Sequence, residues 1–151
     1  MSARDYCSRK PVSVDPAASL RSAVQLMEAE GVGCVVVTEQ GRPVGMLTDR
    51  DAALTVLTRK LDADSVPVRE VMQQPLQTLE ADAPIAWALS LLRTNRLRRL
   101  PVVEASGALV GVLSLDDLLR LIATEVGDLA EAIRRQLSQP SSPPTASQGA
   151  A

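Results

Sequence analysis

The chain has 151 residues, of which 46% are hydrophobic, and Trp87 and Tyr6 are its only two aromatic residues. This length suits one compact domain or two small fused ones, and the core must be aliphatic. A net charge of −2 argues against nucleic acid as the main partner, while the absence of histidine excludes imidazole catalysis and disfavours Cys/His zinc sites.

The cysteines and the N-terminal residues indicate the cellular compartment of the protein. Cys7 and Cys34 form neither a metal-binding spacing nor a disulfide framework. The N-terminus has no apolar signal region, and no apolar stretch approaches the ~20 residues of a membrane span. The sequence therefore predicts a cytoplasmic protein with no membrane partner.

The first half of the chain predicts a strand, a helix, two more strands and a second helix. After a short strand at 13–14, apolar residues at i, i+3, i+4 and i+7 mark one helix face: Leu20, Ala23, Val24 and Met27. Residues 34–38 are β-branched and apolar, as in a buried strand. Gly41 suits a tight hairpin turn, and the last helix should begin near Asp49.

The second half repeats this order about 65 positions later. Its first helix has the same apolar face, made of Ile85, Ala88, Leu89 and Leu92. A strand is expected at 100–104, a turn at Gly107 and a last helix from about Leu115. The segments around Gly45 and Gly111 also match, since Val44, Leu47, Thr48 and Asp51 correspond to Val110, Leu113, Ser114 and Asp117.

A repeat of this size buries little surface alone, so the two copies should pack together around a pseudo-twofold axis. We therefore predict an α/β fold of two strand–helix–strand–strand–helix repeats, at 5–62 and 70–125, joined by a linker at 63–69.

The C-terminal part has a different character. Val126, Leu129, Ile133 and Leu137 keep helical spacing. They predict a helix at 126–137, which either covers the core or meets a second subunit. Residues 138–151 are Ser, Pro, Gln, Ala, Thr and Gly without an apolar pattern, and they predict a disordered tail.

Two segments resemble the CBS-domain family, which is named for cystathionine β-synthase. They read Val-Gly-Met-Leu-Thr-Asp-Arg-Asp at 44–51 and Arg-Arg-Leu-Pro-Val-Val at 98–103, the latter leading into 109–114. The resemblance covers roughly residues 5–125 in two copies, the usual tandem pair of the family. It implies a regulatory module that binds AMP, ADP, ATP or S-adenosylmethionine in clefts between the repeats, forms a homodimer and signals to a partner protein.

The resemblance also implies contacts from Thr48 with Asp51, and from Ser114 with Asp117. Each carboxylate would accept the ribose hydroxyls, and each hydroxyl would contact phosphate beside a helix N-terminus. The same Ser/Thr-x-x-Asp pattern is typical of a helix capping box. The two roles do not exclude one another.

Arg98 and Arg99 are the phosphate-binding residues that the resemblance implies. The equivalent stretch of the first repeat, 28–33, has no arginine, so the two clefts should differ. Family precedent pairs the aspartate of one repeat with the early strand of the other, which gives two pairs: Asp117 with Ser13, and Asp51 with Thr78. Asp117 with Arg98 and Arg99 forms the more complete set, whereas Asp51 lies in the more typical motif.

An adenine base would stack on aliphatic side chains, because the chain has no phenylalanine. The candidates, which could equally be ordinary core residues, are Val12, Val35, Met46 and Val102. The sequence contains no nucleophile–base pair, metal-ligand set or glycine-rich phosphate loop, so we predict that the protein is not an enzyme and requires no cofactor. The alternative to a nucleotide sensor is a dimerisation scaffold that needs no ligand.

Overall fold

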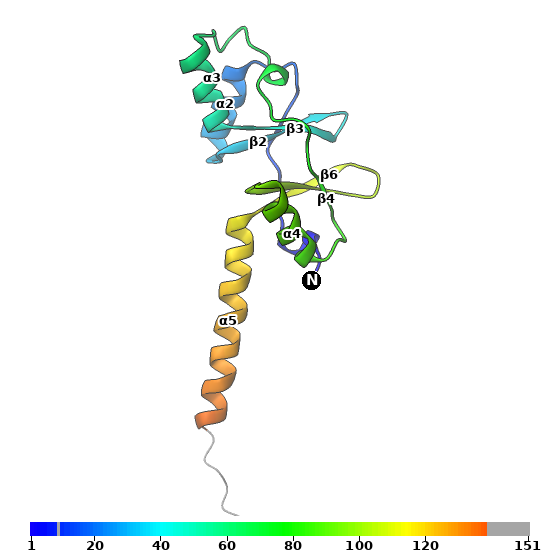
Figure 1. The fold of residues 1–151 in the computed structure, drawn as a ribbon, viewed down its shortest axis with the longest axis vertical. Helices are drawn as coiled ribbons and strands as arrows, with labels where there is room; N and C mark the ends of the chain where they lie inside the picture. Colours follow the sequence, from blue (N-terminus) through cyan, green and yellow to red (C-terminus); the bar gives the residue numbers. More distant parts are fainter. Residues whose placement is uncertain (9, 139–151) are drawn as a thin grey trace, which may run out of the picture. The chain divides into compact units, whose positions relative to one another are not determined.

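The computed structural model describes residues 1–8 and 10–138. Its strands form two three-stranded sheets, which are β1 (Ser13–Val14), β2 (Cys34–Glu39) and β3 (Arg42–Thr48), and β4 (Leu79–Glu80), β5 (Arg99–Val103) and β6 (Leu109–Ser114). In each sheet the short first strand runs parallel to the second. The second and third strands of each sheet form a hairpin, as Figure 1 shows for β2 and β3.

Each repeat adds two helices to its sheet. They are α2 (Leu20–Glu30) and α3 (Asp49–Arg59) in the first repeat, and α4 (Ile85–Asn95) and α5 (Leu115–Ser138) in the second. A short helix, α1 (Ala3–Tyr6), and a 3₁₀ turn, η1 (Val68–Glu70), precede the two repeats at equivalent positions. The predicted α/β fold of two equivalent repeats is confirmed.

Local sequence signals set the helix boundaries. The hydroxyl of Ser19 accepts a hydrogen bond from the Ser22 amide at 3.1 Å and caps the start of α2. The helix ends at Gly31, whose φ of 64° lies in the left-handed region that glycine adopts without strain. Pro84 precedes the first turn of α4, where a missing amide proton costs nothing.

Each repeat has its own aliphatic core, and each core is completed by a segment that precedes the other repeat. Ala3 and Cys7 are buried in the core of the second repeat, beside Leu100 and Leu113. Residues 63–72, expected to be partly a linker, contribute the buried Val66 and Val68 to the core of the first repeat. The chain therefore crosses between the repeats twice: once between Ser8 and Ser13, a segment of which residues 10–13 are described, and once at 73–79.

Gly45 and Gly111 stand where these crossing segments approach the sheets. A Cβ atom at Gly111 would collide with the backbone oxygen of Ser8 and the side chain of Cys7. At Gly45 it would collide with the side chain of Met72. The motif glycine of each repeat is therefore explained by close packing of the chain over it.

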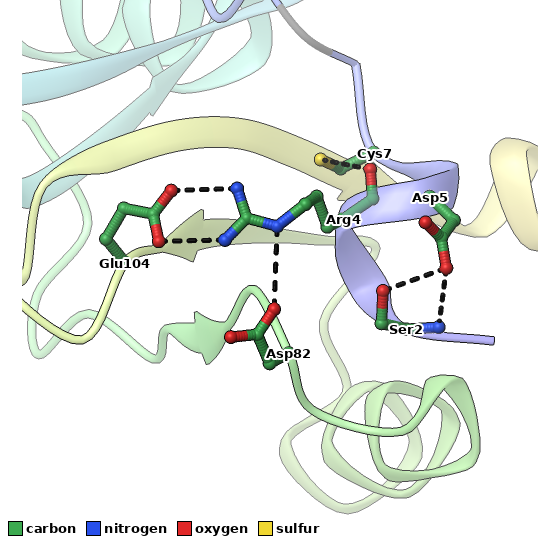
Figure 2. Close-up of polar contacts among 6 residues, drawn as sticks. All are labelled: Ser2, Arg4, Asp5, Cys7, Asp82 and Glu104. Atoms are coloured by element: carbon green, nitrogen blue, oxygen red, sulfur yellow. Dashed lines mark hydrogen bonds and ion pairs between the residues drawn. The ribbon is translucent and has the colours of Figure 1, made fainter.

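Side-chain bonds anchor α1 to the second repeat. The guanidinium of Arg4 donates two hydrogen bonds to the carboxylate of Glu104, both at 2.8 Å, and its Nε lies 3.5 Å from Asp82 (Figure 2). Backbone amides of Ala3 and Arg4 donate to carbonyl oxygens just before α4. The first residues of the chain thus belong structurally to the second repeat.

The described residues divide into a compact unit up to Leu118 and the part of α5 from Leu119 onward. Helix α5 is continuous through the segment expected to be a separate C-terminal helix. Ser138 is its last residue, and the rest of the predicted disordered tail lies outside the described residues. Within the part of the chain that the structure describes, no helix combines the length and apolar character needed to cross a membrane.

Candidate functional site

A cavity of about 420 Å³ lies between the two repeats beside the start of α3, and we call it the Asp51 cavity. Its lining comes from the β3–α3 junction, the crossing segment 73–77 and the loop before β5. The lining residues are Met46, Thr48, Asp49, Arg50, Asp51, Gln73, Pro75, Leu76, Gln77, Arg96, Leu97, Arg98 and Arg99.

A second cavity, of about 300 Å³, lies beside the start of α5, and we call it the Asp117 cavity. It is formed by the β6–α5 junction, the first crossing segment and the loop before β2. The lining residues are Ser8, Lys10, Pro11, Val12, Gly31, Val32, Gly33, Cys34, Val36, Arg99, Val112, Ser114 and Asp117.

The two cavities are built from equivalent positions of the two repeats. Residues 73–77 in one correspond to 8–12 in the other, and residues 96–99 correspond to 31–34. The chemistry differs at the second set, because the positions of Arg96, Arg98 and Arg99 are taken by two glycines and a cysteine. The two cavities are therefore lined by equivalent positions but differ in the charge of their lining residues.

In the Asp51 cavity the aspartate is held by the capping box of α3. Its Oδ2 accepts hydrogen bonds from the Thr48 hydroxyl at 2.6 Å and the Gln73 side-chain amide at 2.8 Å. The Thr48 hydroxyl in turn accepts from the Asp51 amide. Oδ1 makes no hydrogen bond among the described residues. One oxygen thus caps the helix, and the other keeps its lone pairs for a ligand.

The same arrangement holds Asp117 at the start of α5. Its Oδ2 accepts from the Ser114 hydroxyl at 2.5 Å and from the Ser114 amide at 2.8 Å. No residue corresponding to Gln73 adds a third bond, because Ser8 occupies that position. The cap predicted from the Ser/Thr-x-x-Asp pattern is present in both repeats.

The charges of the two linings favour anions to different degrees. Four arginines and two aspartates line the Asp51 cavity, which gives 4 − 2 = +2. Lys10, Arg99 and Asp117 line the other cavity, which gives 2 − 1 = +1. Within the described residues, none of the four arginines forms an ion pair. Their guanidinium groups are therefore uncommitted donors for phosphate oxygens.

The structure redistributes the arginines that we grouped from sequence with Asp117. Arg98 lines only the Asp51 cavity, and Arg99 contributes to both. The more complete set of charged groups is therefore the one around Asp51. The reason is the crossover of the chain, which brings the loop before β5 against the α3 start of the other repeat.

Other expected site residues fall outside the linings. Ser13 and Thr78 are exposed and line neither cavity, because the crossing segments reach the cavities a few residues earlier. Val35 and Val102 are fully buried in the two cores. Of the candidate adenine-contacting residues, Val12 and Met46 do line cavities, one in each.

Sequence reasoning missed Lys10, Gln73 and Arg96 as lining residues. The 65-residue offset between the repeats could have paired two of them with their counterparts, since Gln73 lies 65 positions after Ser8 and Arg96 lies 65 positions after Gly31. The offset does not by itself show that each crossing segment borders a cavity.

Cys34 lies in the wall of the Asp117 cavity and is a free thiol. Burial raises the pKa of this thiol above its ordinary value, the positive charge of Arg99 opposes the shift, and Asp49 adds to it. Cys34 therefore lacks the lowered pKa of an activated catalytic cysteine.

The fold and the paired cavities define a two-repeat module of known type. The model of the CBS domain matches residues 3–57 and 68–124, and the chain belongs to this family.

Three known proteins place the chain within the family. The CBS domain-containing protein YhcV of Bacillus subtilis is 36% identical over 117 residues, which cover 78% of this chain and 82% of YhcV. An uncharacterised protein of Methanopyrus kandleri, MK0525, is 29% identical over 136 residues, or 89% of this chain and 69% of that protein. The solved structure of the CBS domain protein PAE2072 from Pyrobaculum aerophilum, complexed with AMP, aligns with a TM-score of 0.73 at 30% identity, over 85% of this chain and 99% of that one.

Proposed function

We propose that this protein is a regulatory module that binds an adenine nucleotide in the Asp51 cavity and signals its presence to a partner protein. The observation that carries the proposal is the meeting, in one cavity, of a capped aspartate from the first repeat with three arginines from the second. The relative complexed with AMP supports the choice of ligand class.

The chemistry of the cavity suits each part of a nucleotide. Arg96, Arg98 and Arg99 offer bidentate donors to phosphate oxygens. Asp51 offers an oxygen to the ribose hydroxyls, and the apolar wall includes Met46 for the base. S-adenosylmethionine is a weaker candidate, because its sulfonium carries a positive charge and would face four arginines. A volume of about 420 Å³ falls in the range of small-molecule sites.

A ligand in this cavity can also act as a signal. The aspartate and the arginines come from different repeats, so a bound nucleotide bridges them. Its affinity then depends on how the repeats are placed, and it favours the arrangement in which both sets of contacts are made. This bridging supports regulation rather than catalysis in a chain that has no histidine. Because the spacing of the two cysteines in the sequence indicates no disulfide framework, we propose the reducing cytoplasm as its compartment.

The test is a thermal shift and calorimetric titration with AMP, ADP, ATP, GTP, NAD and S-adenosylmethionine. A ligand at 100 times its dissociation constant adds about 2.7 kcal/mol of stability, or roughly 5–10 °C in Tm for a chain of this size. Asp51→Ala should weaken AMP binding about tenfold or more, because charge-assisted hydrogen bonds contribute about 1.5–3 kcal/mol. Asp117→Ala is the matched control, since it removes the same cap from the other cavity. Unchanged Tm and no heat with every compound would refute the proposal.

A second function, homodimerisation, is favoured by α5. Its apolar residues recur at spacings of three and four and are between 50% and 82% exposed: Leu119, Ile122, Val126, Leu129, Ile133 and Leu137. We call this row the α5 stripe. Such a spacing is typical of a helix that pairs with another helix.

The occupant that fits the α5 stripe best is α5 of a second copy. The stripe spans 18 residue steps, or about 27 Å, whereas the 11-residue α4 spans only about 16 Å. A second α5 matches its length. Pairing of this kind also fits the alternative in which the module is a scaffold.

A further inference from the structure

Among the described residues, Arg99 alone lines both cavities. It is the first residue of β5 and pairs in register with Ser114, the capping residue of α5. Its positive charge acts to lower the pKa of the Cys34 thiol, against the larger effect of burial, and Cys34 lies in the wall of the Asp117 cavity. Its neighbour Arg98 lines only the Asp51 cavity.

We propose that the two cavities share the guanidinium of Arg99, so that a nucleotide phosphate bound in the Asp51 cavity weakens anion binding in the Asp117 cavity. This inference rests on the proposed nucleotide-binding function and deepens it. It makes the protein a sensor with two unequal sites that oppose each other.

The physical reason is that one planar guanidinium grips one phosphate at a time when it binds in bidentate fashion. If it turns toward the Asp51 cavity, the Asp117 cavity keeps only Lys10 as a cation among its described lining residues. If it turns the other way, the Asp51 cavity still has Arg50, Arg96 and Arg98. The Asp51 cavity should therefore fill first, and the Asp117 cavity second and less tightly.

The effect has an expected size. A hydrogen-bonded contact to a charged group contributes about 1.5–3 kcal/mol, which corresponds to a change in affinity of about tenfold or more. Filling the first cavity should weaken AMP binding in the second by a factor of this order. Because coupling between binding sites is reciprocal, a ligand held in the Asp117 cavity would weaken the Asp51 site by the same factor.

Cys34 allows the Asp117 cavity to be observed alone. It lines that cavity and is partly exposed, whereas Cys7 is buried in a core. AMP bound in the Asp117 cavity should protect Cys34 from a small maleimide, measured by mass spectrometry. The AMP concentration at half protection then reports the affinity of this cavity, while calorimetry reports total binding.

The experiment compares the wild type with Asp51→Ala, in which AMP binding to the Asp51 cavity is weakened about tenfold or more. Half protection should occur at about tenfold lower AMP in D51A, because Arg99 is released to the other cavity. In the Arg99→Ala background the same D51A change should leave the half-protection concentration unaltered. Arg98→Ala is a second test of the same point. It removes an arginine of the Asp51 cavity alone, so it should lower total AMP affinity and, like D51A, shift half protection of Cys34 to a lower AMP concentration.

The outcomes separate the inference from the proposed function. If AMP binds but Cys34 is protected at the same concentration in wild type and D51A, or is never protected, the sharing of Arg99 is wrong and the Asp51 site stands. If AMP produces neither heat nor protection in any of these proteins, the proposed function fails and the sharing fails with it. Asp51→Asn, which preserves an acceptor for the α3 cap, provides a second variant should D51A melt early in a circular dichroism scan.

Discussion

Arg96 occupies in the second repeat the position that Gly31 occupies in the first, and both backbones are left-handed, with φ of 53° and 64°. A glycine adopts this conformation without strain, whereas an arginine pays about 1 kcal/mol because its Cβ crowds the following carbonyl. Gly31 borders the Asp117 cavity and Arg96 the Asp51 cavity. The second repeat therefore accepts a strained helix end where it gains a cation.

Replacing Arg96 with glycine should raise the stability of the fold and weaken AMP binding. R96G is expected to raise Tm by about 2–4 °C, because it relieves roughly 1 kcal/mol of backbone strain. The same change should weaken AMP binding, since it removes one of the four cations of the Asp51 cavity. Thermal melts with and without AMP measure both effects. Arg93→Gly, in the exposed last turn of α4, is the control and should lower stability without altering AMP affinity.

Replacing Gly45 or Gly111 with alanine should reduce the stability of the fold to different degrees. Gly111→Ala should destabilise the fold by about 1–3 kcal/mol, because the new methyl group meets the backbone of Ser8. Gly45→Ala should be milder, since the side chain of Met72 that it meets is flexible and can move. Urea unfolding of the two variants gives the comparison. Equal losses at both positions would contradict the explanation by close approach.

The Arg4–Glu104 pair predicts a pH-dependent contribution to stability. Hydrogen bonds from Arg4 hold the pKa of the Glu104 carboxyl below its ordinary value. A carboxyl with a lowered folded pKa stabilises the fold above its unfolded pKa, and this contribution is lost as the pH falls through the folded pKa.

Glu104→Gln should therefore lower Tm slightly at pH 7. The difference from wild type should shrink as the pH falls below the ordinary glutamate pKa of about 4.3, and vanish below the lowered folded pKa. The effect should be small because both side chains are partly exposed. Asp82→Asn provides the control, since Asp82 is 88% exposed and lies farther from Arg4. Melting curves across this pH range are the measurement. A difference that grows on acidification would show that the pair does not act in this way.

The α5 stripe predicts a dimer that a single charge can disrupt. Ile133→Lys places an ammonium group within the apolar contact of the helix pair and should reduce the mass in solution to that of one chain. Thr124→Lys, on the opposite face of the helix, should leave the mass unchanged. Light scattering after size-exclusion chromatography checks both. A dimer that persists in I133K at low micromolar concentration would mean that the copies meet elsewhere.

Much of the fold could be predicted because its signals are local. The apolar face of α2 recurs in α4 about 65 residues later, and the hairpin glycines Gly41 and Gly107 both have the positive φ that their turns require. The capping pairs Thr48–Asp51 and Ser114–Asp117 were also readable, because a cap joins residues only three positions apart.

The residues that share a cavity with each of these capped aspartates could not be predicted from the sequence. We grouped Arg98 with Asp117, and the structure places it with Asp51. The arginine and the aspartate are 47 positions apart in the sequence, and no local pattern links them. Ser13 and Thr78 were likewise expected at the cavities, which the chain instead borders with residues 8 and 10–12 and with residues 73 and 75–77.

The repeated element order, the aliphatic character of the core and the helix caps follow from the chain alone, since they depend on neighbouring residues and on periodicity. Which repeat completes which core, which cavity holds the arginines and the place of Arg99 beside both cavities depend on how the chain packs. The cause is that the chain crosses between the repeats twice. Each site is therefore assembled from segments brought together by packing, and their separation along the chain carries no information about that contact.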